Sequence, residues 1–256
     1  MKEAFALYAA AFFFGSAFGS FFYTLALRLS SDLFTGRTFK LLTQPSACDA
    51  CGASIRWYAM IPVAGYLLTG RRCPACRIAL RATYPVSEAA AGLLLCLLIS
   101  SFGISFYTLS LFLLICVAAV IALVDCKKMM IPDVLVAVFL LLSIYPAYSS
   151  GDWKSNAWGI LILGGFFFVI ILLFPGGFGG GDMKFAAALG FFAGMELAIV
   201  LLETALIIGS IFGILYAIKT RKGFRVRIPF APFLFAGLVT AVFWGREIVM
   251  LYYSFF

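Results

Sequence analysis

The sequence contains no histidine, and few of its residues carry a charge. Without histidine, Ser-His-Asp and Cys-His nucleophile systems are excluded, and so is a catalytic zinc held by imidazole. No side chain remains whose unperturbed pKa lies near 7. Any acid–base chemistry must therefore come from carboxylates, lysine, cysteine or tyrosine.

Charge is scarce because the chain is very apolar. Of its 256 residues, 64% are hydrophobic and 12% are charged, whereas about a quarter of a typical soluble domain is charged. Several runs lack Asp, Glu, Lys and Arg, and each is long enough, at about 18–25 residues, to cross a bilayer as a helix: 4–27, 104–124, 134–151, 157–178 and 228–245. The first run exceeds a typical signal-peptide core, so we expect it to remain as a membrane helix.

These runs predict an all-α polytopic membrane protein with about eight transmembrane helices. The expected segments are 4–27, 84–101, 104–124, 131–149, 157–176, 184–194, 196–218 and 232–252. The sixth segment is short and Glu196 follows it. Irregular backbone survives at membrane depth only where protein or water covers it, so we expect a broken or partly buried helix there.

The basic residues indicate the orientation. All Lys and Arg except Lys2, Lys154 and Arg246 fall in stretches that can share one side of the membrane: 28–83, 125–130, 177–184 and 219–231. The positive-inside rule predicts that this side is cytoplasmic and that both termini lie on the outer side of a bacterial inner membrane. Anionic lipid accounts for the net charge of +8, so no nucleic-acid partner is expected.

The polar stretch 28–83 contains two CxxC pairs. Cys48 and Cys51 form the first pair, and Cys73 and Cys76 form the second. Two such turns supply the four thiolates of a closed, structural Zn²⁺ site, which would hold together a loop too small to fold on its own core. A redox pair or two disulfides are the alternatives, and a cytosolic location argues against stable disulfides.

Two aspartates stand where predicted helices meet the cytoplasmic face. Asp125 ends the third segment, and Asp182 begins the sixth, directly after a glycine-rich run. Two close carboxylates cannot both ionise easily, so one keeps its proton while the other activates a water molecule. The pair therefore predicts an aspartic protease, with Gly179, Gly181 and Lys184 supporting the loop that carries Asp182.

Each aspartate also has a purely structural interpretation. Asp125 would then be a solvated helix end paired with Lys127 or Lys128, and Asp182 would be a helix N-cap.

These motifs resemble the type IV prepilin peptidases, and the resemblance extends over nearly the whole chain. The GxGDxK motif matches at Gly179-Gly180-Gly181-Asp182-Met183-Lys184. The other matching segments are Gly15–Phe21, the two CxxC pairs, Arg81–Glu88, Asp125 with Ile131-Pro132-Asp133, and Ile228–Phe233.

The resemblance implies cleavage of a basic leader from a type IV prepilin or pseudopilin, after a glycine and at the cytoplasmic face. It also implies N-methylation of the new terminus with S-adenosylmethionine, without singling out the residues that bind this donor. The expected parts are a first transmembrane helix (1–28), a zinc-binding loop domain linked to methyl transfer (29–83), and a transmembrane aspartic peptidase domain (84–256).

Two other functions are compatible with parts of the pattern. Intramembrane carboxylates and broken helices also occur in proton-coupled transporters, and a zinc loop can serve as a docking module in a non-enzymatic assembly scaffold. A transporter would lose flux when Asp125 or Asp182 is replaced, and a scaffold would leave a prepilin leader uncut.

Overall fold

The computed structural model describes residues 2–30, 47–48, 50–55, 57–174, 177–220 and 228–255. Much of the first half of the expected loop domain, residues 31–46 with 49 and 56, lies outside the described residues. The described part is helical, with isolated β-bridges as its only strand-like pairing. It divides into two compact units, Met1–Thr108 and Leu109–Phe256.

The first unit is built on two long helices that pack together, α1 (Lys2–Ser30) and α4 (Thr83–Phe102). Their backbones approach closely at Gly19, where a Cβ would lie 2.8 Å from the Ser87 carbonyl oxygen. Such close packing is how helices associate in lipid, where burial of apolar surface gives no advantage. The described part of the polar loop between them contributes η1 (Trp57–Met60) and α3 (Ala64–Leu68).

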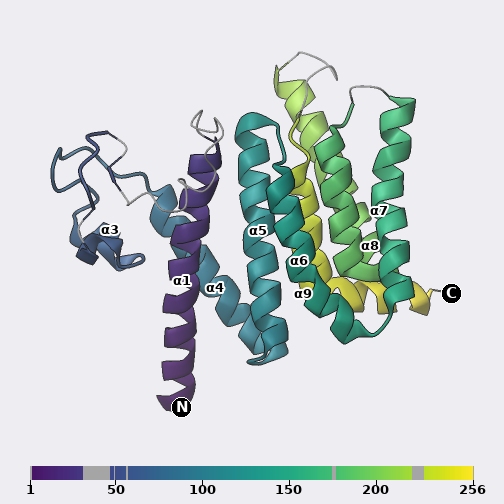
Figure 1. Cartoon of the computed structure of the whole chain (residues 1–256), viewed down its shortest axis with the longest axis horizontal. Helices are drawn as coiled ribbons and strands as arrows, with labels where there is room; N and C mark the ends of the chain where they lie inside the picture. The colour runs from purple at the N-terminus through teal and green to yellow at the C-terminus, as the bar shows by residue number, and fades with distance from the viewer. Residues whose placement is uncertain are drawn as a thin grey trace. The chain divides into compact units, whose positions relative to one another are not determined.

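The described residues of the second unit form five helices, and α8 is the one that contacts α6, α7 and α9 (Figure 1). The five are α5 (Phe106–Lys128), α6 (Asp133–Ser150), α7 (Trp153–Leu173), α8 (Gly180–Thr220) and α9 (Ala231–Ser254). Local signals fix several ends. Gly151, at φ 71°, closes α6, and the side chain of Asp152 caps α7 by accepting from the Ser155 N–H.

Helix α8 consists of two helical segments that meet at Gly194, where φ is 71° and ψ is −179°. The second segment runs antiparallel to α9. Leu197, near the start of this segment, lies against Gly245 near the end of α9, and Gly209 lies against Phe233 near the start of α9. Among the described residues, seven helices are long and apolar enough to cross a membrane. Since α8 holds both the sixth and the seventh predicted segments, this architecture confirms the predicted set of about eight.

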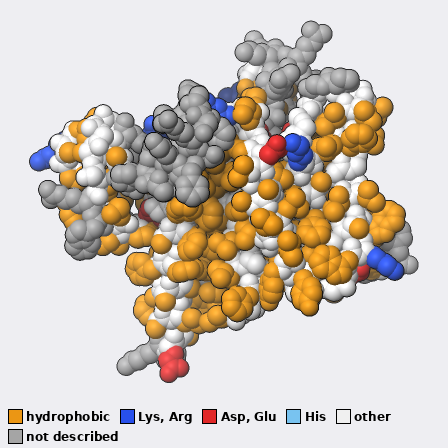
Figure 2. Space-filling model, in the orientation of Figure 1, with side chains coloured by type: hydrophobic (Ala, Val, Ile, Leu, Met, Phe, Trp, Pro, Cys, Tyr) orange, Lys and Arg blue, Asp and Glu red, His pale blue; other side chains and the backbone are white. Residues whose placement is uncertain are grey.

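The outward surfaces of these helices are apolar. Large side chains such as Leu141, Leu172 and Ile218 are 67%, 63% and 70% exposed, and hydrophobic side chains cover much of the visible face (Figure 2). Water cannot solvate so much hydrocarbon at low free energy. The described helices therefore belong in a bilayer.

Helices α7 and α8 touch backbone to backbone. A Cβ placed on Gly159 would lie 2.1 Å from the Gly190 carbonyl oxygen, and a Cβ on Gly190 would be equally close to the Gly159 oxygen. Farther along α7, a Cβ on Gly165 would meet nothing within 4 Å. The contact between Gly159 and Gly190 thus fixes the separation of the two helices.

Replacing Gly159 by Ala should therefore destabilise the protein. The added methyl group can be accommodated only if α7 and α8 move apart, and we expect the apparent melting temperature of the detergent-solubilised protein to fall by several degrees. Gly165→Ala is the matched control in the same helix. It should leave the melting temperature unchanged or raise it, because alanine favours helix over glycine by about 1 kcal/mol. Equal effects of the two substitutions would contradict the proposed contact.

Candidate active site and metal centre

Asp125 lies in the last turns of α5 and is 5% exposed. Its carboxylate accepts a hydrogen bond from the backbone N–H of Ala231, at 3.1 Å. Ala231 opens α9, and the first N–H groups of a helix have no partner within it. Asp125 therefore caps the start of another helix, which gives its buried charge a hydrogen-bond donor and a favourable helix dipole.

Asp182 lies in the first turn of α8. Its Oδ2 accepts from the Gly179 N–H at 3.1 Å, while its Oδ1 is buried and has no hydrogen-bond partner among the described residues. This bond reaches back to the residue before α8, whereas an N-cap side chain accepts from N–H groups inside the helix, so Asp182 is not the N-cap of α8. The other oxygen is left over, and a buried polar atom without a partner is costly in a folded protein.

Several contacts bring the surroundings of the two aspartates to the same end of the second unit. Phe178 lies just before α8 and Phe230 just before α9, and the centroids of their rings are 5.0 Å apart. Gly181 lies against Ile131, where a Cβ would be 3.0 Å from the Ile131 Cβ. These contacts place both aspartates at the same end of the second unit.

Lys184 has a partner that the sequence did not reveal. Its ammonium group forms a salt bridge with Asp133 at the start of α6, with contacts of 2.9 Å and 3.0 Å to the two carboxylate oxygens. Both side chains are more than half exposed. The pair links the first turn of α8 to the first turn of α6, and it lies on the motif segments that flank the two aspartates.

The four cysteines of the polar loop converge on one point. Their sulfur atoms all lie within 4.8 Å of one another, with 3.8 Å between Cys48 and Cys76 and 4.0 Å between Cys51 and Cys73. A tetrahedral ion bound at about 2.3 Å would hold its sulfurs about 3.8 Å apart. The cluster therefore has the spacing to hold a metal ion, as the CxxC pairs predicted.

Each CxxC pair is built as the same tight turn. The Cys48 N–H donates to the Ala53 carbonyl, and the Cys73 N–H donates to the Ile78 carbonyl, both at 2.9 Å. The residue after the second cysteine has a positive φ in both turns, 68° at Gly52 and 60° at Arg77. Glycine adopts this conformation readily, but the arginine gave no such signal in the sequence, because few non-glycine residues do so.

The two thiols of the second pair differ. At Cys76 a backbone hydrogen bond with Ile78 is outweighed by burial and by hydrogen bonds with the neighbouring thiols, which raise the pKa to about 11. Hydrogen bonds from the backbone N–H groups of Cys76 and Ala75 lower the pKa of the Cys73 thiol to about 6. A thiol with this pKa is largely ionised at neutral pH, and thiolates rather than thiols ligate metals.

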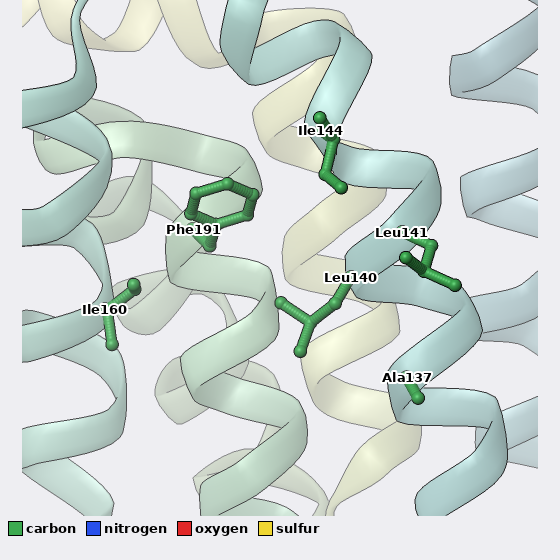
Figure 3. Close-up of a pocket in the computed structure, with 6 residues that line it drawn as sticks. All are labelled: Ala137, Leu140, Leu141, Ile144, Ile160 and Phe191. Carbon is green, nitrogen blue, oxygen red and sulfur yellow. The ribbon is translucent and has the colours of Figure 1, made fainter.

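A groove of about 420 Å³ lies among α6, α7 and α8 in the second unit (Figure 3). Apolar side chains from the three helices line it: Ala137, Leu140, Leu141, Ile144, Ile160 and Phe191. It contains none of the predicted catalytic or metal-binding residues. Elsewhere α6 packs on α8, where the ring of Phe139 contacts the rings of Phe185 and Phe192.

Comparisons with known proteins match both units. The model of the bacterial peptidase A24 N-terminal domain matches residues 13–102, and the model of the type IV leader peptidase family matches residues 111–218. The gap between the two matches contains the boundary between the two structural units.

Curated relatives cover most of the chain. One from Bacillus subtilis (strain 168) is 29% identical over 94% of this chain and 96% of its own. One from Pseudomonas aeruginosa is 29% identical over 85% and 78%, and one from Aeromonas salmonicida is 30% identical over 84% and 77%. Each is named prepilin leader peptidase/N-methyltransferase. No solved structure matches the chain.

We expect the four-cysteine cluster to bind one metal ion per chain. Cys51→Ser should lower the bound metal at least tenfold, because it removes one of four thiolates from a closed shell. Elemental analysis of the purified protein measures this ratio. Cys96→Ser is the control, since Cys96 lies on α4 outside the cluster and should leave the metal content unchanged. Equal metal loss in both variants would rule out the cluster as the binding site.

Proposed function

The chain belongs to the type IV leader peptidase family, and on that basis we propose that Asp125 and Asp182 are the catalytic pair of an aspartic endopeptidase. The substrate we propose is a type IV prepilin or pseudopilin, cut after a glycine that ends its basic leader. The single observation that carries the assignment is the state of Asp182, whose buried Oδ1 has no partner among the described residues, at the same end of the second unit as the buried Asp125.

The two carboxylates act as one acid–base unit. Because they repel each other in a poorly solvated site, the pair holds one proton between them. The Ala231 N–H and the Gly179 N–H each occupy one carboxylate oxygen. These bonds fix the orientation of both groups, and the remaining oxygens can bind a water molecule and the substrate carbonyl.

The hydrolysis follows from this arrangement. The ionised carboxylate takes a proton from water as the water oxygen bonds to the peptide carbonyl carbon, and the protonated carboxyl gives its proton to the carbonyl oxygen. The intermediate then collapses. One carboxyl delivers its proton to the leaving nitrogen as the C–N bond breaks, and the other carboxylate recovers a proton from a hydroxyl of the intermediate. The pair ends with one proton, as it began.

The glycine-rich approach to Asp182 supports a substrate bound in extended form. Gly179 and Gly180 have no Cβ, and a Cβ on Gly180 would meet nothing within 4 Å. The backbone of a substrate strand can therefore approach this loop closely. The proposed location is the cytoplasmic face of a bacterial inner membrane, supported by the basic residues that share this side in the sequence.

The metal we propose for the four-cysteine cluster is zinc. Sulfur spacings of 3.8 Å and 4.0 Å suit a tetrahedral thiolate shell, and a site closed by four sulfurs stabilises structure rather than catalysing a reaction. The names of the relatives support a second activity, methylation of the new N-terminal amine with S-adenosylmethionine. We propose that residues 84–256 carry the peptidase activity and that the loop 29–83 serves methyl transfer.

Asp125→Asn and Asp182→Asn should each lower leader cleavage by several orders of magnitude. An amide neither accepts the proton from water nor supplies one to the carbonyl, and the members of a catalytic unit fail together. The measurement is the rate at which the purified protein, in detergent or lipid, removes the leader from a prepilin substrate.

The matched control is Asp133→Asn, which changes an exposed carboxylate at the start of α6. It should retain cleavage within about tenfold of the wild type, because an exposed ion pair contributes about 1 kcal/mol or less. All three variants should keep the metal of the cysteine cluster. Near-normal cleavage by Asp125→Asn or Asp182→Asn would refute the assignment.

A further inference from the structure

The turn within α8 separates the segment that carries Asp182 from the rest of the helix. We define the α8 turn as residues 191–195, with Gly194 in a non-helical conformation. The first segment, 180–193, ends at this turn. The break leaves backbone groups without helical partners, and in lipid such groups must find partners within the protein.

Two neighbouring side chains of α7 supply those partners. The Asn156 Nδ2 donates to the Phe191 carbonyl at 2.7 Å, on the first side of the break, and the Met195 N–H donates to the Ser155 Oγ at 2.9 Å, on the second side. Asn156 is 3% exposed. The Ser155 N–H in turn donates to the Asp152 side chain at 3.0 Å, so the cap of α7 also holds Ser155.

A glycine at position 194 is required by these contacts in two respects. Its φ of 71° lies in the region that side-chain-bearing residues rarely adopt, and a Cβ there would lie 2.9 Å from the Ser155 Oγ. One turn further along α7, the Gly159 backbone touches the Gly190 backbone. The first turns of α7 thus determine both the shape of the α8 turn and the direction in which the first segment leaves it.

The opposite end of the first segment combines apolar packing with weak polar contacts. Phe185, one turn after Asp182, is fully buried and its ring contacts that of Phe139 in α6. The polar contacts are few: the salt bridge between Lys184 and Asp133 is exposed, and one carboxylate oxygen of Asp182 has no partner among the described residues. Near the α8 turn, the groove leaves part of the α6 side open (Figure 3). The hydrogen bonds from α7 are therefore the side-chain bonds that hold the turn end of the segment.

The distance from the turn to Asp182 makes this attachment important. At 1.5 Å per residue, the roughly 12 residues between Gly194 and Asp182 span about 18 Å. A change of about 10° in the tilt of the segment would move Asp182 by about 3 Å, and a displacement of about 1 Å can lower a rate about a hundredfold.

We propose that Ser155 and Asn156 are positioning residues for catalysis, acting through the α8 turn on the placement of Asp182 opposite Asp125. The inference rests on the proposed function, because it takes this pair as the catalytic one. Neither residue approaches the reacting atoms. Their effect is on the geometry of the pair, so it should appear in the catalytic step and hardly at all in substrate binding.

The test compares Asn156→Leu and Ser155→Ala with the wild type. Each should lower kcat for leader cleavage about 10- to 100-fold while KM changes less than threefold. The pH profile of kcat should also shift, because the separation of two carboxylates sets how strongly they share a proton. Rates are taken per folded protein, using the monodisperse fraction from size exclusion. If Asn156→Leu does not fold, Ser155→Ala, which loses a single hydroxyl, carries the test.

Ser143→Ala is the matched control. Ser143 is fully buried, and its hydroxyl donates to the Phe139 carbonyl within α6, so the same atom is removed without the loss of a hydrogen bond to the α8 turn. This variant should keep the wild-type kcat and pH profile. Hydrogen exchange gives a readout independent of activity: amides in 183–193 should exchange faster in the Asn156 and Ser155 variants than in the control.

The outcomes separate the inference from the proposed function. If Asp182→Asn is inactive but Asn156→Leu and Ser155→Ala keep the wild-type kcat, pH profile and hydrogen exchange, the positioning role is wrong and the catalytic pair stands. The role is equally wrong if activity falls only in proportion to folded protein. If Asp182→Asn remains active, the catalytic pair itself is wrong, and the positioning role falls with it whatever the exchange data show.

Discussion

The fold depends on one constraint, which is that lipid offers no hydrogen bonds to the backbone. Regular helices meet this constraint internally, and the irregular places show how side chains meet it elsewhere. Asp125 bonds the first N–H of α9, and Asn156 and Ser155 bond the backbone on either side of the α8 turn. In each case a polar side chain from one helix completes the hydrogen bonding of another, and such bonds tie the second unit together.

The same constraint explains how far the sequence could predict the structure. The uncharged runs and their lengths were sufficient to predict the set of membrane segments. The position of Glu196 after a short apolar run was sufficient to predict the break in α8. The CxxC spacing predicted the cysteine cluster, because a short turn directs both sulfurs of a pair toward one point. These features arise from local sequence, and local sequence can be read directly.

The features that escaped prediction depend on residues far apart in the chain. Nothing near Lys184 indicates Asp133 as its partner, and nothing near Ser155 or Asn156 indicates that they bond a turn some 35–40 residues later. Arg77 was missed for another reason, since its residue type argues against a positive φ.

The contact between Gly159 and Gly190 has a consequence for the direction in which the Asp182 side chain points. Because the two helix backbones touch, the first α8 segment cannot rotate about its own axis without a steric clash with the backbone of α7. The azimuth of every side chain on that segment is therefore set by two residues that have no side chain. Substitutions along its lipid-facing surface can change its bulk or its hydrophobicity. They should not change the direction in which the Asp182 carboxylate points, because the glycine contact sets the rotation of the helix.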